Sequence, residues 1–124
     1  STLHTNNAAQ TIDRIIDTFP GDQQNQIRLQ LSNSLLAIFS QRLLPRISGG
    51  RIPAYELLIN NYAISNLIRE ARTAEITTVL ETSAQEGMVS MNQNLADLVR
   101  RGEITTETAY KYSLNPEALQ KRLT

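Results

Sequence analysis

A glycine-rich turn near the middle of the chain restricts the fold more than any other feature. Ser48-Gly49-Gly50 contains two residues that accept positive φ angles, and it lies between Arg46-Ile47 and Arg51 to Ile59. Such a turn between two extended segments is typical of a β-hairpin. Pro53 cannot donate to a strand ladder, so we expect its strand to be an edge there, or to pair only from about Ala54 to Ile59.

Helical patterns occupy most of the remaining sequence. Apolar residues recur every three or four positions from Ala8 to Phe19, which predicts a first helix. A longer second helix is expected from a cap at Asp22 to about Leu44, where Pro45 ends it. Five more helices follow the hairpin, and their start signals are Asn60 or Asn61, Thr73, Ser90 in a capping box with Gln93, Thr105, and Asn115-Pro116. Gly87 is expected to close the helix that Thr73 caps. The predicted fold is therefore mainly α with a small β-hairpin.

Composition excludes several classes of function. The 124 residues fit one compact domain or a piece of a larger one, and 12 basic residues balance 12 acidic residues. We therefore expect no nucleic-acid partner, which would need an extended basic surface. The absence of cysteine excludes disulfides, thiol catalysis and thiolate zinc sites. Apolar runs such as Leu57-Leu58-Ile59 are far shorter than the roughly 20 residues of a transmembrane helix, so no transmembrane segment is expected.

The stretch from Ala63 to Glu70 is predicted to form an amphipathic helix. Its apolar residues stand at positions i, i+3 and i+4, which places them on one face: Ile64, Leu67 and Ile68. Its polar residues are expected to remain in solvent: Ser65, Asn66, Arg69 and Glu70. Periodicity alone thus predicts a core helix with a solvated outer side.

Groups that could perform chemistry are few. His4 is the only histidine, and no nearby residues complete a catalytic triad or a metal site with it. It follows a segment that reads as the end of a strand, where either local hydrogen bonding or a ligand-facing role is possible. Glutamates at 56, 70, 75, 81 and 86 are explained by solvated faces or arginine partners more simply than by acid-base catalysis.

The start of the chain suggests an excised fragment. Residues 1 to 5 read as a strand whose beginning is missing, and no initiator methionine precedes them. The sequence also contains no glycine-rich loop of the form G-x-x-x-x-G-K-[ST].

Six stretches in one order carry the pattern of a known family. They are Ser1-Thr2-Leu3-His4-Thr5-Asn6, Thr11 to Asp17, Phe19 to Gln24, Leu31 to Ala37, Ala84 to Met88, and Leu95 to Gly102. The first resembles a histidine box, and the others resemble the segments that follow it in the same spacing. Together they resemble the PilT-type twitching-motility ATPases, which retract type IV pili and belong to the secretion-ATPase superfamily.

The stretch from Ala63 to Glu70 also resembles the retraction subfamily's octet, Ala-Ile-Arg-Asn-Leu-Ile-Arg-Glu. Seven of the eight positions agree, and Ser65 replaces the usual arginine, which removes one charge. The resemblance favours retraction over pilus-extension and type II secretion ATPases, which lack the octet and often carry a four-cysteine zinc module. Two alternatives stay open: an extension or secretion ATPase, and a free-standing helical interaction module.

The resemblance implies a fold and a set of roles. The chain would be the C-terminal part of a RecA-like α/β P-loop ATPase domain, with residues 1–59 from the ATPase core and residues 60–124 as a helical subdomain. The complete protein would be a cytoplasmic homo-hexamer at the bacterial inner membrane that uses ATP and Mg. Walker A and Walker B would lie upstream, so the chain alone is expected to be inactive. His4 would sense the γ-phosphate, while Asn66, Arg69 and Glu70 would transmit movement to the inner-membrane pilus machinery.

Overall fold

The computed structural model describes residues 7–124, so His4 and the expected strand over residues 1–5 lie outside the described part. The helices are α1 (Ala8–Asp17), α2 (Gln24–Ser34), α3 (Tyr62–Arg69), α4 (Ile76–Glu81), α5 (Met91–Arg100), α6 (Thr106–Tyr112) and α7 (Pro116–Leu123). The strands are β1 (Ala37–Pro45) and β2 (Arg51–Ile59), and single 3₁₀ turns cover Gly21–Gln23, Thr73–Glu75 and Ala84–Glu86. The prediction of a mainly helical fold with one hairpin is confirmed.

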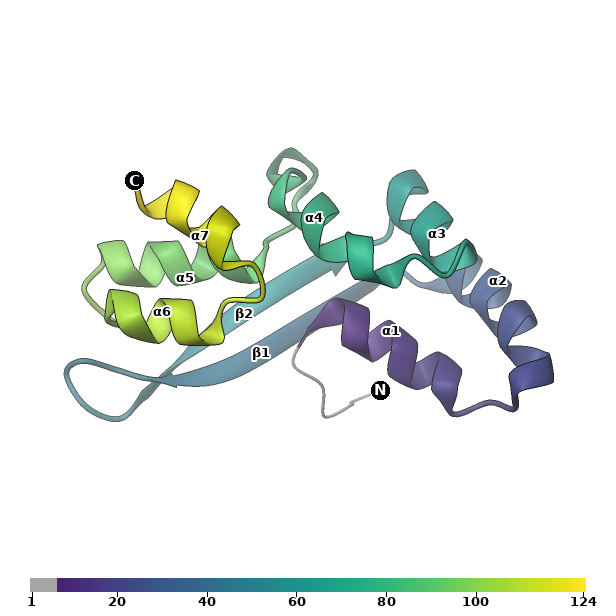
Figure 1. The fold of residues 1–124 in the computed structure, drawn as a ribbon, viewed down its shortest axis with the longest axis horizontal. Helices are drawn as coiled ribbons and strands as arrows, with labels where there is room; N and C mark the ends of the chain where they lie inside the picture. Colours follow the sequence, from purple (N-terminus) through teal and green to yellow (C-terminus); the bar gives the residue numbers. More distant parts are fainter. Residues whose placement is uncertain (1–6) are drawn as a thin grey trace.

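The hairpin is the long central element of the described chain, and helices gather at its two ends (Figure 1). Helices α1 to α4 lie around the end away from the turn, and helices α5 to α7 lie beside the half that leads to the turn. Strands β1 and β2 pair antiparallel along their whole length, from Ala37 opposite Ile59 to Pro45 opposite Arg51. The molecule is therefore elongated along the hairpin.

The predicted second helix is wrong beyond Ser34, because the chain turns extended at Leu35 and enters β1. The amide of Asn60 donates to the backbone oxygens of Ser32 and Leu35, at 3.0 and 2.8 Å. These bonds satisfy carbonyls that the end of a helix leaves without partners. Since Asn60 is 25 or more positions away, the spacing of apolar residues in this stretch does not reveal the stop.

The hairpin turn begins two residues earlier than predicted, directly after β1 ends at Pro45. Arg46 and Ile47, which we expected to form the first strand, belong to the turn, where Gly49 and Gly50 have φ angles of +110° and +69°. The Ile47 N–H donates to the backbone oxygen of Glu103 at 2.8 Å, and Arg46 Nε lies 2.7 Å from Glu103 Oε2. The turn is thus fixed to the segment between α5 and α6.

Two separate apolar clusters flank the hairpin. The first cluster consists of Ala8, Ile12, Ile16, Leu58, Ile64, Leu67, Ile68, Ile76, Leu80 and Met88. The second cluster consists of Leu44, Ile52, Ala54, Met91, Leu95, Ala96, Leu98, Ile104, Ala109 and Leu119. Strand β2 contributes to both, because its inner face continues from one cluster to the other.

The outer edges of the two strands differ. On β2, Leu57 exchanges both backbone bonds with Val89 at 2.8 and 3.0 Å, and the Tyr55 N–H donates to Asn94 Oδ1 at 2.8 Å. Pro53 lies opposite Leu43 on the same edge, where its missing N–H costs nothing, so the edge position expected for it is confirmed. Within residues 7–124, no backbone group bonds to the outer edge of β1.

Most predicted helix starts are confirmed. Side chains cap α3, α5, α6 and α7, and these caps are Asn61, Ser90, Thr105 and Asn115. The cap predicted at Asp22 is wrong, because Asp22 lies in the 3₁₀ turn Gly21–Gln23 and α2 begins at Gln24 without a side-chain cap. Two further details differ from the prediction. Gln93 Oε1 has no hydrogen-bond partner, so only the Ser90 half of the capping box forms. Gly87, with φ of +87°, closes the 3₁₀ turn Ala84–Glu86 and not α4.

Thr73 does not cap a helix, contrary to the prediction. A 3₁₀ turn over Thr73–Glu75 comes first, and α4 begins only at Ile76. The Thr73 hydroxyl instead donates to Asp13 Oδ1 at 2.7 Å, which joins this turn to α1.

Candidate functional surface on helix α3

Helix α3 buries the apolar side that its spacing predicted. Ile64 and Ile68 are fully buried and Leu67 is 8% exposed, all within the first cluster. Asn61 begins the helix, because its Oδ1 accepts a hydrogen bond from the Ile64 N–H at 2.9 Å. The buried side fixes the rotation of the helix, and therefore the direction in which its polar side points.

Two of the predicted site residues meet on the polar side of α3. Arg69 Nη1 donates to Asn66 Oδ1 at 2.6 Å, with Arg69 exposed and Asn66 half-buried. Glu70 is also exposed, but it forms an ion pair with Arg72, whose Nη1 lies 3.0 Å from Glu70 Oε2. The structure therefore brings Asn66 and Arg69 together and places Glu70 in a neighbouring ion pair.

The neighbouring group is a cluster around Arg72, which confirms the arginine partner expected for Glu70 and Glu75. Arg72 Nε and Nη2 donate to the two carboxylate oxygens of Glu75 at 2.5 and 2.7 Å. These bonds lower the pKa of Glu75, and with the contact to Glu70 they raise the pKa of Arg72. Because Arg72 and Glu75 stand three positions apart, the spacing signalled the pair. The two-pronged contact holds the guanidinium in one orientation beside Glu70.

A strained residue ends helix α3. Ala71 has a φ of +60°, the left-handed conformation that favours glycine. The Arg72 N–H donates to the backbone oxygen of Leu67 at 2.8 Å, and the Ala71 N–H donates to that of Ile68 at 3.2 Å. These two hydrogen bonds form a Schellman motif, which normally has glycine at the left-handed position. It turns the chain back so that Arg72 reaches Glu70.

Ser65 does not lie in open solvent, contrary to the prediction. Its side chain is half-buried, with its Oγ 2.8 Å from the backbone oxygen of Ser32 and 3.0 Å from Asn60 Oδ1. The hydroxyl has one proton, which these two acceptors share. Ser65 therefore fastens α3 to the end of α2, a contact that joins residues 33 positions apart.

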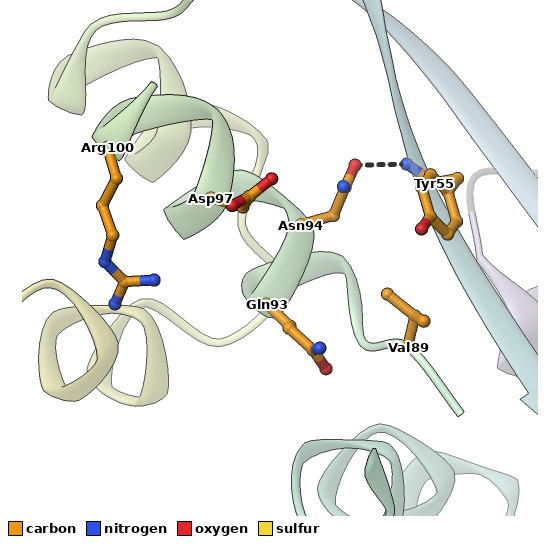
Figure 2. Close-up of a pocket in the computed structure, with 6 residues that line it drawn as sticks. All are labelled: Tyr55, Val89, Gln93, Asn94, Asp97 and Arg100. Carbon is orange, nitrogen blue, oxygen red and sulfur yellow. Dashed lines mark hydrogen bonds between the residues drawn. The ribbon is translucent and has the colours of Figure 1, made fainter. Parts of the chain in front are cut away.

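A shallow pocket of about 230 Å³ lies between β2 and α5 (Figure 2). It is lined by Tyr55, Val89, Gln93, Asn94, Asp97 and Arg100. Figure 2 shows Asn94 extending to the Tyr55 backbone, so its side-chain oxygen is already used. Residues 7–124 contain no group of three His, Cys, Asp or Glu side chains that could hold a metal ion. We assign no chemistry to the pocket.

The fold matches solved ATPase structures. A crystal structure of the pilus retraction motor PilT with bound ADP aligns with a TM-score of 0.80 and 48% identity, covering 97% of this chain and 33% of that one. The Legionella pneumophila ATPase DotB aligns with a TM-score of 0.68 and 19% identity, covering 89% of this chain and 30% of that one, which shows a shared fold only. The fold thus occurs as part of solved ATPases, one of them a pilus retraction motor.

Curated proteins of twitching motility are similar to this chain in sequence. A twitching motility protein from Neisseria gonorrhoeae is 45% identical over 119 residues, which are 95% of this chain and 32% of that protein. The type IV pilus retractation ATPase PilT from Pseudomonas aeruginosa is 41% identical over 94% of this chain and 34% of that protein. No family model matches. The chain is a relative of the PilT-type twitching-motility ATPases, and it spans about a third of the length of these proteins.

Proposed function

We propose that the chain is the C-terminal part of a PilT-like motor that powers type IV pilus retraction and twitching motility. The complete protein would be a homo-hexamer with a RecA-like α/β P-loop domain, and it would act in the cytoplasm at the bacterial inner membrane. Similarity to a twitching motility protein and to a pilus retraction ATPase supports the proposal. None of the helices in residues 7–124 is long and apolar enough to cross a membrane.

Helix α3 provides the observation that best supports a mechanical role. Its apolar side is buried, so folding leaves its outer side available. There the Asn66 oxygen holds the Arg69 guanidinium in place before any partner arrives, and Glu70 is held by Arg72. A surface of fixed polar groups is suited to transmitting force to the inner-membrane pilus machinery.

In our proposal the phosphate loop and the Mg ligands belong to the part of the protein that this chain does not span. The sequence has no phosphate loop, and the described residues contain no cluster of metal-binding side chains. We therefore derive no step in which this chain holds the nucleotide. In our proposal Walker A and Walker B belong to the part of the protein that its relatives have and this chain does not span, and the chain alone is inactive. The role of His4 as a γ-phosphate sensor remains a proposal.

In the proposed mechanism, residues 1–59 at the end of the ATPase core and residues 60–124, the helical subdomain, move as one compact unit when nucleotide chemistry occurs in the part of the protein that this chain does not span. Helix α1 would pass movement to α3 through rigid contacts. Both helices contribute to the first cluster, and the bond between Thr73 and Asp13 links α1 to the turn that follows α3. Ser65 and Asn60 hold the other side of α3 to α2. Close-packed interiors shift as bodies because they deform little, so a displaced α1 would carry the Asn66 and Arg69 surface with it.

A paired substitution in the complete protein tests the role of α3. Replacing both Arg69 and Glu70 with alanine should abolish pilus retraction while ATP hydrolysis continues, since neither residue contributes to the buried core. The matched control replaces Asp97 and Arg101, an exposed ion pair of 3.5 Å on α5. This control removes the same two charges and should leave retraction intact. Normal retraction in the Arg69 and Glu70 variant would refute the proposed surface.

The coding sequence and an ATPase assay test the motor itself. The complete gene should encode a phosphate loop upstream of Ser1, and the complete protein should hydrolyse ATP whereas the 124-residue chain should not. A gene without that loop would rule out the motor and leave an interaction module.

A further inference from the structure

One arginine in the last helix bonds to the end of a helix in the other cluster. Arg122, in the last turn of α7, has its Nε 2.9 Å from Glu81 Oε2, and its Nη2 donates to the backbone oxygen of Glu81 at 3.0 Å. Glu81 is the last residue of α4, where the final backbone oxygens have no partner within the helix. The negative end of the helix dipole also favours a cation there. Arg122 therefore binds both the carboxylate of Glu81 and the end of α4.

This contact is more sheltered than the other ion pair on the nearby helices. The side chains of Arg122 and Glu81 are 27% and 12% exposed, whereas those of Arg101 and Asp97 are 58% and 55% exposed. A guanidinium that makes two bonds in a sheltered position holds its partner in one geometry. Arg122 is itself held, because Nη2 of Arg100, the last residue of α5, donates to its backbone oxygen. The contact thus joins the ends of three helices.

The arginine partner that we expected is confirmed for Glu81, but both expectations for Glu56 are wrong. Glu56 is 1% exposed and forms no ion pair with a basic side chain of residues 7–124. Its Oε1 accepts a hydrogen bond from the N–H of Ala8 at 2.9 Å. Burial raises the pKa of Glu56, the bond from Ala8 lowers it, and the charge of Glu81 raises it. Arg122 therefore offsets a negative charge that acts on a buried carboxylate.

The bonds of Arg122 join the two clusters on the helical side of the molecule. Helix α4 contributes Ile76 and Leu80 to the first cluster, and α7 contributes Leu119 to the second. Among the ion pairs of residues 7–124, only that of Arg122 and Glu81 joins elements of different clusters. Figure 1 shows α4 and α7 on the same side of the hairpin. Two clusters that shared only a two-stranded hairpin could hinge about it, and a link between these helices opposes that movement.

We propose that Arg122 is a positioning residue that holds the two clusters in one orientation, so that they turn as one body. The inference rests on the proposed function, in which residues 1–59 and residues 60–124 move as one compact unit. Movement that reaches α4 through the first cluster passes to α7 through Arg122, and from α7 to α5 through the bond from Arg100. Without Arg122 the second cluster lags behind the first, and part of each stroke is lost in bending the molecule.

A distance measurement between two spin labels in the 124-residue chain tests the orientation. The chain has no cysteine, so Asp17→Cys on α1 and Glu107→Cys on α6 provide two exposed labelling sites, one beside each cluster. Pulsed electron paramagnetic resonance should give one narrow distance distribution, and Arg122→Gln should broaden or split it. The matched control Arg101→Gln removes the same charge from the exposed pair with Asp97 and should leave the distribution narrow. A distribution unchanged by Arg122→Gln would overturn the proposal.

Two more conservative variants keep the test decisive if Arg122→Gln does not fold. Arg122→Lys keeps the charge, but one ammonium group does not reproduce the two-pronged geometry toward the carboxylate and the backbone oxygen of Glu81. Glu81→Gln keeps the shape and the backbone oxygen but removes the charge that Arg122 pairs with. Each variant should broaden the distance distribution, and wild-type distributions in both would contradict the role of Arg122.

The complete protein then tests the consequence for the motor. Arg122→Gln should leave the KM for ATP unchanged and lower the pilus length retracted per ATP, whereas Arg101→Gln should change neither quantity. If the complete protein hydrolyses no ATP, the proposed function fails while the distance result stands. If it hydrolyses ATP and the two variants retract equal lengths per ATP, the role of Arg122 in the motor fails alone.

Discussion

The two clusters are held together in different ways. In the second cluster, α5, α6 and α7 each begin with a side-chain cap from the adjoining residue, and these caps are Ser90, Thr105 and Asn115. In the first cluster, α1 and α3 have such caps, whereas α2 and α4 have none. Helix α2 depends instead on Asn60 and Ser65, which reach it from far along the sequence.

This difference shows where the molecule is locally determined and where it depends on its tertiary contacts. Helices of the second cluster carry their own start signals, so they need neighbours mainly for burial. The first cluster must form as a whole, because α2 ends correctly only when α3 is in place. The candidate surface on α3 therefore lies in the more interdependent part of the molecule.

The largest expected effect comes from cavities in the two clusters. Leu80→Ala in the first cluster and Leu95→Ala in the second remove equally buried side chains, 1% and 0% exposed. Each should lower the free energy of unfolding by about 2–5 kcal/mol. Urea denaturation measures the change in the free energy of unfolding, and amide exchange shows which helices lose protection. Leu80→Ala should loosen α1 to α4 together, and loosening confined to α4 would contradict the interdependence of the first cluster.

A smaller loss of stability is expected when a helix cap is removed, and the loss should be larger for a cap that is distant in sequence than for an adjoining one. Asn60→Ala leaves the backbone oxygen of Leu35 without its side-chain donor and that of Ser32 with Ser65 alone, and it should cost about 1–3 kcal/mol. Thr105→Ala removes an exposed cap of the Thr108 amide and should cost about 1 kcal/mol. Denaturation of both variants under the same conditions gives the comparison. Equal costs would mean that the distant cap is no stronger than the local one.

The strained end of α3 predicts a stabilising substitution. Ala71→Gly relieves the left-handed conformation and should raise the free energy of unfolding by about 0.5–1 kcal/mol. Ala63→Gly, placed within the same helix, should lower it by about 0.5–1 kcal/mol. Thermal unfolding of both variants checks the opposite signs, and a loss of stability in Ala71→Gly would show that this end is not strained.

The smallest effects are pH-dependent and have opposite signs in two carboxylates. Arg72 lowers the pKa of exposed Glu75, so the stability from this pair is present above the ordinary pKa of 4.5 and is lost as the pH falls through the lowered value. The difference in the free energy of unfolding between the wild type and Glu75→Gln should therefore become smaller in acid. Salt should weaken it as well, since the pair is exposed.

Glu56 gives the matching contrast. Because its pKa is raised from 4.5, its contribution is fully present below that value and is lost as the pH rises through the raised pKa. Glu56→Gln should therefore cost more stability in acid than at neutral pH. Urea titrations of both variants across this range measure the two slopes, and slopes of the same sign would contradict the assignment.

The sequence predicted elements whose signals are local. The stripe of Ile64, Leu67 and Ile68 identified α3, and cap residues located the starts of α5 to α7. It did not predict β1, because the residues from Leu35 to Leu44 also fit a helical spacing and the stop comes from Asn60.

The candidate site was predicted in part for the same reason. The spacing within α3 placed Asn66 and Arg69 on one polar side, but it did not reveal that they bond to one another, and the contact of Ser65 with α2 depends on the tertiary fold. The burial of Glu56 could have been predicted from the sequence, since strand alternation places it on the same face of β2 as Ala54 and Leu58. Only the structure shows that the Ala8 amide meets it there.

The uncovered edge of β1 has a practical consequence for handling the isolated chain. Phe39 and Leu43 are 60% and 52% exposed beside backbone groups that have no partner among residues 7–124. Such an edge is a template for adding another strand, which favours aggregation as concentration rises. A lysine at Gln41, whose side chain is exposed in the middle of this edge, should act as a gatekeeper and keep the chain monodisperse at concentrations where the wild type aggregates.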